Sequence, residues 1–127
     1  SLVNCNLTDA DFSYSNLHGA DLRKATMNNL SLLRANLAFA DLSDADLTVA
    51  NLKDANLSFA KLTNANLKDA NLEGGELTSA ELSSADLKNV SLEGANLKDA
   101  DFSNSNLKGV DFKDSICKGT VFKNSTQ

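Results

Sequence analysis

Residues 50–62 read A-N-L-K-D-A-N-L-S-F-A-K-L, and this stretch decides the fold. Alanine returns every five residues, and a leucine follows each alanine two places later. A step of five rotates a side chain by about 140° around an α-helix, so these leucines would form no stripe on a helix. In a continuous strand, an odd step would place successive leucines on opposite faces. The period therefore argues against both a helix bundle and a flat sheet.

A coil with corners satisfies the same period. Within one unit the alanine and the leucine are two residues apart, so both point to one side of a short extended segment. If the remaining two residues turn the chain, the next alanine and leucine face the same interior. Repetition then builds a closed polygonal coil, whose successive turns lie about 4.8 Å apart, as paired strands do. The stretch predicts a β-solenoid.

The pattern covers the whole chain of 127 residues. The 25 positions in steps of five from Leu2 hold 19 leucines, four phenylalanines, Met27 and Cys117. The 25 positions three residues after them hold 15 alanines, and most of the others are small. We therefore expect a single domain over residues 1–127. The chain begins inside the repeat and has no initiator methionine, so we leave open whether it is part of a longer protein.

Violations of the pattern indicate how many units close one coil. Bulky residues replace the alanine at Leu30, Val90 and Val110, whose positions differ by sixty and by twenty. The positions of two core aromatics, Phe102 and Phe122, also differ by twenty. Multiples of twenty are expected if four units form a coil and like residues stack in columns. The sequence thus predicts a four-sided coil of four units, repeated about six times.

The A-(D/N)-L-x-x tandem resembles the pentapeptide-repeat proteins over essentially all 127 residues. The resemblance implies an all-β fold, a right-handed quadrilateral parallel β-helix. In it, the central Leu or Phe and the residue two before it point inward, and the other three positions face solvent. The sequence departs from the repeat at three places, where we do not expect a regular coil: Met27 with Leu30, Gly74-Gly75, and Ile116-Cys117.

Few residues in this pattern suit catalysis or cofactor binding. A dense stack of leucine and alanine should leave little void, so we expect no small-molecule pocket. His18 is the only histidine and falls in an outward slot. Asp and Asn recur before the core leucine because short polar side chains can hydrogen-bond the neighbouring backbone. We expect no catalytic residues, no cofactor and no enzymatic activity.

Metal binding has little support either. Asp21 and Asp41 share a column, which makes stacked carboxylates for calcium conceivable, but the glycine-rich nonapeptide of calcium-binding β-rolls is absent. Cys5 and Cys117 have no histidines nearby, so they predict no zinc site. Both fall in inward slots near opposite ends of the rod, too far apart for a disulfide. We expect buried free thiols, with the small Cys117 balancing large aromatic neighbours in its coil.

Two aromatic residues are the best surface candidates. Phe39 and Phe59 each follow a core leucine by two residues, on the same side of the coil and one coil apart. Rings about 4.8 Å apart can pack on each other, which is a structural role. Exposed aromatic residues are also enriched at protein interfaces, which is a binding role. The sequence leaves both interpretations open.

Lys68, Lys88 and Lys108 form a second candidate, because they stack in one column. The first interpretation is a solvated ladder of charges, with Asp69 and Asp86 as partners. The second is a stripe that binds a macromolecular partner.

These features favour a non-enzymatic interaction module, a rigid rod that presents columns of side chains to a protein partner. No signal peptide is present, and no apolar run is long enough to span a membrane. Together with the free cysteines, this favours a cytoplasmic location without membrane contact. Open coils at both ends suggest end-to-end association or flanking caps.

The alternative comes from the resemblance, because some pentapeptide-repeat proteins protect DNA gyrase by mimicking duplex DNA. Duplex DNA carries about one charge per 1.7 Å, or roughly 18 over a rod of about 30 Å. The net charge here is only −5, concentrated on the side that carries Glu73 and Glu93. The charge therefore favours the general interaction module over DNA mimicry, and nucleic acid is not an expected partner.

Overall fold

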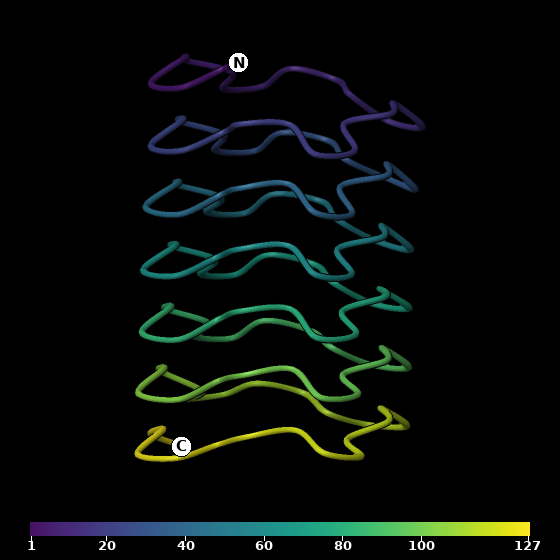
Figure 1. Ribbon diagram of the computed structural model, residues 1–127, viewed down its shortest axis with the longest axis vertical. Coiled ribbons are helices and arrows are strands. Elements are labelled where there is room, and N and C mark those ends of the chain that lie inside the picture. The colour runs from purple at the N-terminus through teal and green to yellow at the C-terminus, as the bar shows by residue number, and fades with distance from the viewer.

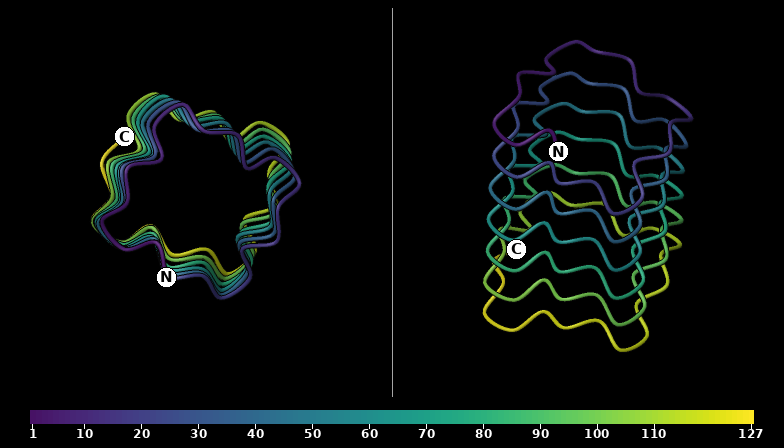
Figure 2. Two further views of the ribbon diagram at one scale, coloured as in Figure 1. Left: turned by 90° about the horizontal axis from the view of Figure 1, so that it is seen from above. Right: turned by 45° about the horizontal axis from the view of Figure 1, so that its top comes forward.

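The computed structural model describes residues 1–127 as a stack of coils around one axis, with the two termini at opposite ends (Figure 1). Every bridge between coils is parallel and joins residues whose numbers differ by twenty, from Asn6 with Thr26 to Asn106 with Thr126. Seen from above, the coils lie over one another around a closed outline (Figure 2). The predicted right-handed quadrilateral β-helix, with four five-residue units in each coil, is confirmed.

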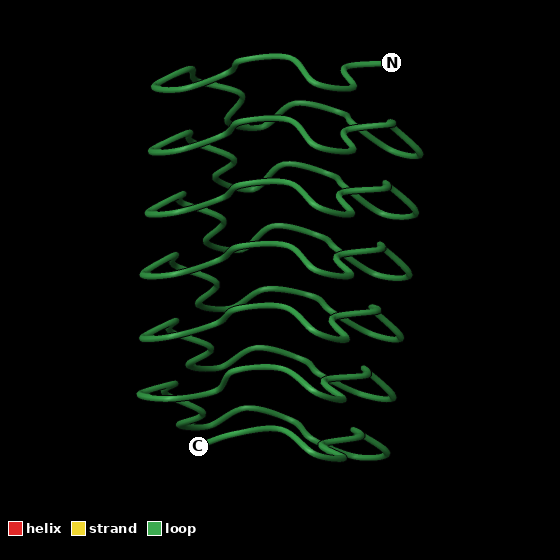
Figure 3. Ribbon diagram, turned by 90° about the vertical axis from the view of Figure 1, so that its left-hand side faces the viewer, coloured by secondary structure: helices red, strands yellow, loops and turns green.

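The chain forms no helix and no continuous strand. Single bridging residues alternate with turns along its whole length, so the ribbon is drawn as loop throughout (Figure 3). No segment of the protein therefore forms a helix that could cross a membrane. We number the four sides of the coil by the core residue of the first coil: face 1 at Leu2, face 2 at Leu7, face 3 at Phe12 and face 4 at Leu17, each continuing at every twentieth residue.

Each five-residue unit has the same internal order. A bridge residue precedes the core residue, two turn residues follow it, and a small inner residue completes the unit. In the unit of Leu52, for example, the N–H of the inner residue Ala55 donates to the carbonyl oxygen of Leu52 at 3.0 Å. This bond closes a four-residue turn at the corner of the coil.

The second turn residue has a positive φ in all 25 units. A β-turn with positive φ only at this position requires glycine or, less well, Asn or Asp. This requirement explains why Gly, Asn and Asp fill most of the slot. It also marks the exceptions, because Val49 has a φ of 60° and branched side chains rarely adopt that conformation.

The core is continuous from Leu22 to Leu107, where the inward side chains are almost completely buried. The inward residues of the first and last coils are only half-buried or exposed, because no further coil covers them. The expectation of two buried thiols is therefore wrong. Cys5 is half-buried and Cys117 is exposed. Phe112 and Phe122, which flank Cys117 in the repeat, contact edge to face at 5.8 Å.

The three local departures from the repeat disturb the coil very little. Bridges continue on both sides of them, so the register of four units per coil is kept. At two of them the turn is slightly open: the bond from Leu30 to Met27 and that from Thr120 to Cys117 are both 3.3 Å long. The turn at Gly75 keeps the usual 3.0 Å.

Candidate interaction surface

One N–H group in each unit, that of the first turn residue, has no backbone acceptor. Wherever the bridge residue is Asp or Asn, its Oδ1 accepts a hydrogen bond from this N–H, as Asn56 does from Ser58 at 3.0 Å. This holds in all 16 such units. The predicted backbone role of Asp and Asn is confirmed, so these carboxylates serve the fold.

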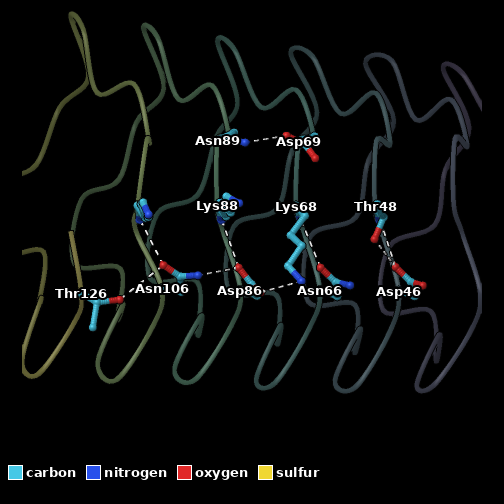
Figure 4. A network of polar contacts seen from close by, with 11 residues as sticks. Asp46, Thr48, Asn66, Lys68, Asp69, Asp86, Lys88, Asn89, Asn106 and Thr126 are labelled. Atoms are coloured by element: carbon cyan, nitrogen blue, oxygen red, sulfur yellow. Dashed lines mark hydrogen bonds and ion pairs between the residues drawn. The ribbon is translucent and has the colours of Figure 1, made fainter.

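Face 2 carries the lysine column, Lys68, Lys88 and Lys108. Lys68 and Lys88 lie within a network of polar contacts (Figure 4). Lys68 pairs with Asp86 at 3.2 Å, as predicted, whereas Lys88 and Lys108 form no ion pair. The predicted pairing of Asp69 with the lysine column is wrong. Its Oδ1 accepts instead from Nδ2 of Asn89, one coil away in its own column, at 2.9 Å (Figure 4).

Face 3 holds all of the other coil-to-coil ion pairs. Arg34 pairs with Asp54 at 3.5 Å and Lys53 with Glu73 at 3.2 Å. Lys113 pairs with the carboxylate of the coil before it, also at 3.2 Å. The most negative face of the rod is therefore partly neutralised by its own cations.

Two exposed aspartates have lowered pKa values, and both causes are local. The Arg23 guanidinium donates two hydrogen bonds of 2.8 Å to the carboxylate of Asp21 and lowers its pKa to about 2. Side-chain and backbone hydrogen bonds from Ser13 lower the pKa of Asp11. Both arrangements belong to corner geometry and offer no acid or base poised for catalysis.

Face 4 carries the aromatic column, which we define as His18, Phe39 and Phe59. The two phenylalanine rings stack in parallel, with centroids 4.9 Å apart and planes 5° apart. The His18 ring also lies near Phe39, with centroids 5.4 Å apart and planes tilted by 51°. The predicted stack is confirmed, yet the rings remain 57% and 49% exposed, so stacking alone leaves half of their surface in water.

Both phenylalanines occupy the second turn slot, with φ values of 61° and 59°. This left-handed conformation costs a side chain with a Cβ about 1 kcal/mol. A parallel stack of two rings stabilises the fold by a similar amount, about 1 kcal/mol. Two such residues share one stack, so the stack offsets the backbone cost of only about one of them, and the repeat itself gives no reason to prefer the aromatic column to Asn or Gly.

The five-residue units that carry the column are uncharged over three consecutive coils, although Asp41 and Lys61 follow the two phenylalanines by two residues on the next face. The face 4 units 16–20, 36–40 and 56–60 contain no Asp, Glu, Lys or Arg. No other face is free of charge over three consecutive coils. Protein interfaces are depleted of charge at their centre and enriched in aromatic residues, and this patch has both properties.

The two predicted candidate sites lie on opposite sides of the rod. Lys68 follows Phe59 by nine positions, close to half of a coil of four five-residue units, so faces 2 and 4 oppose each other. The structure therefore does not join the lysine column and the aromatic column into one site.

Sequence reasoning missed two further exposed hydrophobic residues. Tyr14 and Val49 occupy second turn slots on faces 3 and 2, and they are 67% and 53% exposed. Each stands alone in its column, with no aromatic or aliphatic neighbour in the next coil. The signal that could have found them is the same one that identified the phenylalanines, a large side chain where the turn requires Gly, Asn or Asp.

The rod contains no pocket, and no group of three or more metal-ligating side chains comes together on it. A sequence model of pentapeptide repeats matches eight copies, over residues 1–29, 31–69 and 65–104. The chain belongs to the pentapeptide-repeat family. None of the curated proteins compared with it matches.

Solved structures give the same assignment. A pentapeptide repeat protein from the thylakoid lumen of Arabidopsis thaliana is 32% identical, with a TM-score of 0.75 over 77% of this chain and 68% of that one. Another from Nostoc PCC 7120 is 43% identical, with a TM-score of 0.58 over 59% of this chain and 62% of that one. QnrB1, a plasmid-mediated fluoroquinolone resistance protein, is 18% identical, with a TM-score of 0.59 over 98% and 77%. The likeness to QnrB1 concerns the fold alone.

Proposed function

We propose that the protein is a non-enzymatic interaction module whose rigid rod presents the aromatic column on face 4 to a protein partner. One observation carries the proposal: Phe39 and Phe59 stay half-exposed in slots where the turn favours smaller polar residues. Strained positions that persist without a gain in stability are typical of functional sites. The uncharged units around the rings supply the low-charge centre that such an interface needs.

The lysine column supports a weaker, separate contact. Lys88 and Lys108 carry no ion pair, so an acidic partner could approach them without displacing a protein carboxylate. The neighbouring Asp86 and Asp69 reduce the local field, however. We therefore place the principal interface on face 4 and assign face 2 a supporting role.

The alternative function is protection of DNA gyrase by mimicry of duplex DNA. The fold likeness to QnrB1 motivates it, but the charges do not follow a DNA-like pattern. Face 3 is the most negative side, and three of its carboxylates, those of Asp54, Glu73 and Glu93, are paired with cations of the same chain. A supercoiling assay decides this point: inhibition of gyrase at micromolar protein would favour mimicry over the interaction module.

Photo-crosslinking tests the principal proposal. Phe39 is replaced by p-benzoylphenylalanine, which keeps an aromatic ring in the column, and the protein is irradiated in the cells that make it. The matched control carries the same group at Val49, an exposed residue in the same turn slot on the opposite face. We expect a discrete crosslinked protein from position 39 that is absent from position 49.

The double variant Phe39→Asn with Phe59→Asn provides the second arm. Asn tolerates the left-handed conformation, so the fold should persist and its circular dichroism should be unchanged. Co-purification of the crosslinked protein should fall at least tenfold, whereas Val49→Asn should leave it unchanged. Equal co-purification with all three proteins would show that face 4 is not the interface.

A further inference from the structure

The aromatic column has one open end. Phe39 has two aromatic neighbours, His18 at 5.4 Å and Phe59 at 4.9 Å. Phe59 has a ring on one side only, and no other aromatic side chain approaches its second face. The next residue in the same column is Ser79, whose side chain is too small to cover a ring.

Three side chains in this slot approach the following coil. Oδ1 of Asn89 lies 2.5 Å from where a Cβ of Gly109 would be, one coil further on. Asp54 and Asp99 lie over the glycines of the following coils in the same way. Ser79 lies in the coil that follows Phe59 in this column, and it is itself partly covered.

Carboxylates without cations lie on both sides of this open end. Glu76 is three residues before Ser79 and Glu81 is two residues after it, and neither forms an ion pair. Glu76 already accepts hydrogen bonds from Thr78 Oγ1 and from the Nδ2 of an asparagine one coil away. Glu81 makes no side-chain hydrogen bond, so its carboxylate is free to take a new partner.

The nearest cations of the chain form no ion pair with these carboxylates. Lys61 bridges to Glu81 through the backbone, but its ammonium group is not within ion-pair distance of that carboxylate. Lys98 lies in the coil after Ser79, next to Asp99, and is also unpaired. An open aromatic face with acidic neighbours is the surface that a planar cation fits, because a guanidinium can stack on the ring and bind a carboxylate together.

We propose that this open end binds an arginine side chain of the protein partner, with the guanidinium stacked on Phe59 and paired with Glu81. The proposal rests on the interaction function of face 4 and specifies what the partner presents there. Arginine fits better than lysine because its cation is flat and can continue a stack in which the rings are 4.9 Å apart. The net charge of −5 adds a general attraction for a basic segment.

A peptide titration followed by nuclear magnetic resonance tests this inference. The probe is the capped peptide Gly-Gly-Arg-Gly-Gly, and the protein carries labelled backbone nitrogen and labelled phenylalanine rings. Saturable shifts are expected at the Phe59 ring and at the Ser79 amide, with millimolar affinity. The control peptide has citrulline in place of arginine, which keeps the planar shape and removes the charge.

Variants assign the contacts. Phe59→Asn should abolish the shift at Ser79, and Glu81→Gln should weaken binding about two- to fivefold. Val49→Asn, on the opposite face, should bind the peptide like the parent protein. A lysine peptide should bind more weakly than the arginine peptide by about two- to fivefold.

Equal shifts with the citrulline peptide, or unchanged binding by Phe59→Asn, would overturn the arginine site. So would a concentration-dependent dimer through face 4, because a second copy would then cover the column. These outcomes leave the interaction function to be judged by crosslinking at position 39. Crosslinking that succeeds while the peptide fails to bind would retain the interface and remove only the arginine.

Discussion

Two of the five columns of side chains on each face, the core column and the second turn column, use the sequence in different ways. In the core column, nearly every residue is Leu or Phe and is almost completely buried between Leu22 and Leu107. In the second turn column, every residue has the same left-handed backbone, yet the side chains range from glycine to phenylalanine. The interior is constrained by volume, whereas the corner is constrained by conformation only. Residues that carry function are therefore expected at the corners.

The largest effect should come from a cavity in the core column. Leu57 is fully buried, so Leu57→Ala should lower the free energy of unfolding by about 2–5 kcal/mol. Leu7 occupies the same slot in the first coil but is only half-buried, and Leu7→Ala should cost clearly less. Urea unfolding followed by circular dichroism measures both. Equal losses would mean that the first coil is as well packed as the middle of the rod.

A smaller effect should follow from the bridge residues. Asn71→Ala removes the acceptor of the Glu73 N–H, a hydrogen bond of 2.9 Å, and should cost about 1 kcal/mol. Thr26→Asn is the converse change, because the N–H of Asn28 has no acceptor and a side-chain amide would supply one. We expect Thr26→Asn to raise the free energy of unfolding by about 0.5–1 kcal/mol. A loss of stability with Thr26→Asn would argue against the bridge-residue rule.

Sequence reasoning reached the fold and the ring stack because both depend only on the period. A residue's place in the repeat fixes its coil, its face and its direction, so Phe39 and Phe59 had to meet. The period does not fix rotamers. Asp69 has a lysine next to it in sequence, but its carboxylate meets Asn89, which shares its column one coil away. The exposure of Cys117 was missed for another reason, because an inward direction buries a side chain only where another coil covers it.

The second turn column offers a sharper test of what the aromatic residues contribute to stability. Val49→Asn should relieve left-handed strain and raise the free energy of unfolding by about 1 kcal/mol. Phe59→Asn relieves the same strain but removes the stack with Phe39, so its net effect should be close to zero. Thermal and urea unfolding of the two variants give the comparison directly. A large loss with Phe59→Asn would show that the stack is mainly structural.

The smallest effect concerns a single exposed corner. The pKa of Asp21 is lowered to about 2 by the hydrogen bonds from Arg23, below the ordinary 3.8. A lowered pKa in the folded state adds stability that is present above about pH 4 and is lost as the pH falls toward 2. Asp21→Asn keeps an acceptor for the Arg23 N–H but removes the charge. We expect the parent protein to be slightly more stable than Asp21→Asn at pH 6 and equal to it near pH 2.

The control for this comparison is Asp114→Asn, because the Asp114 carboxylate forms no ion pair and sits at an exposed corner in the last coil. The difference in stability between Asp114→Asn and the parent protein should not change between pH 4 and pH 2 in the way expected for Asp21→Asn. If both variants approach the stability of the parent protein by the same increment over that window, the pH dependence arises from the overall charge of the rod and not from the Arg23 contact. If only Asp21→Asn does, the contact between Asp21 and Arg23 itself stabilises the folded protein, although it lies on the surface.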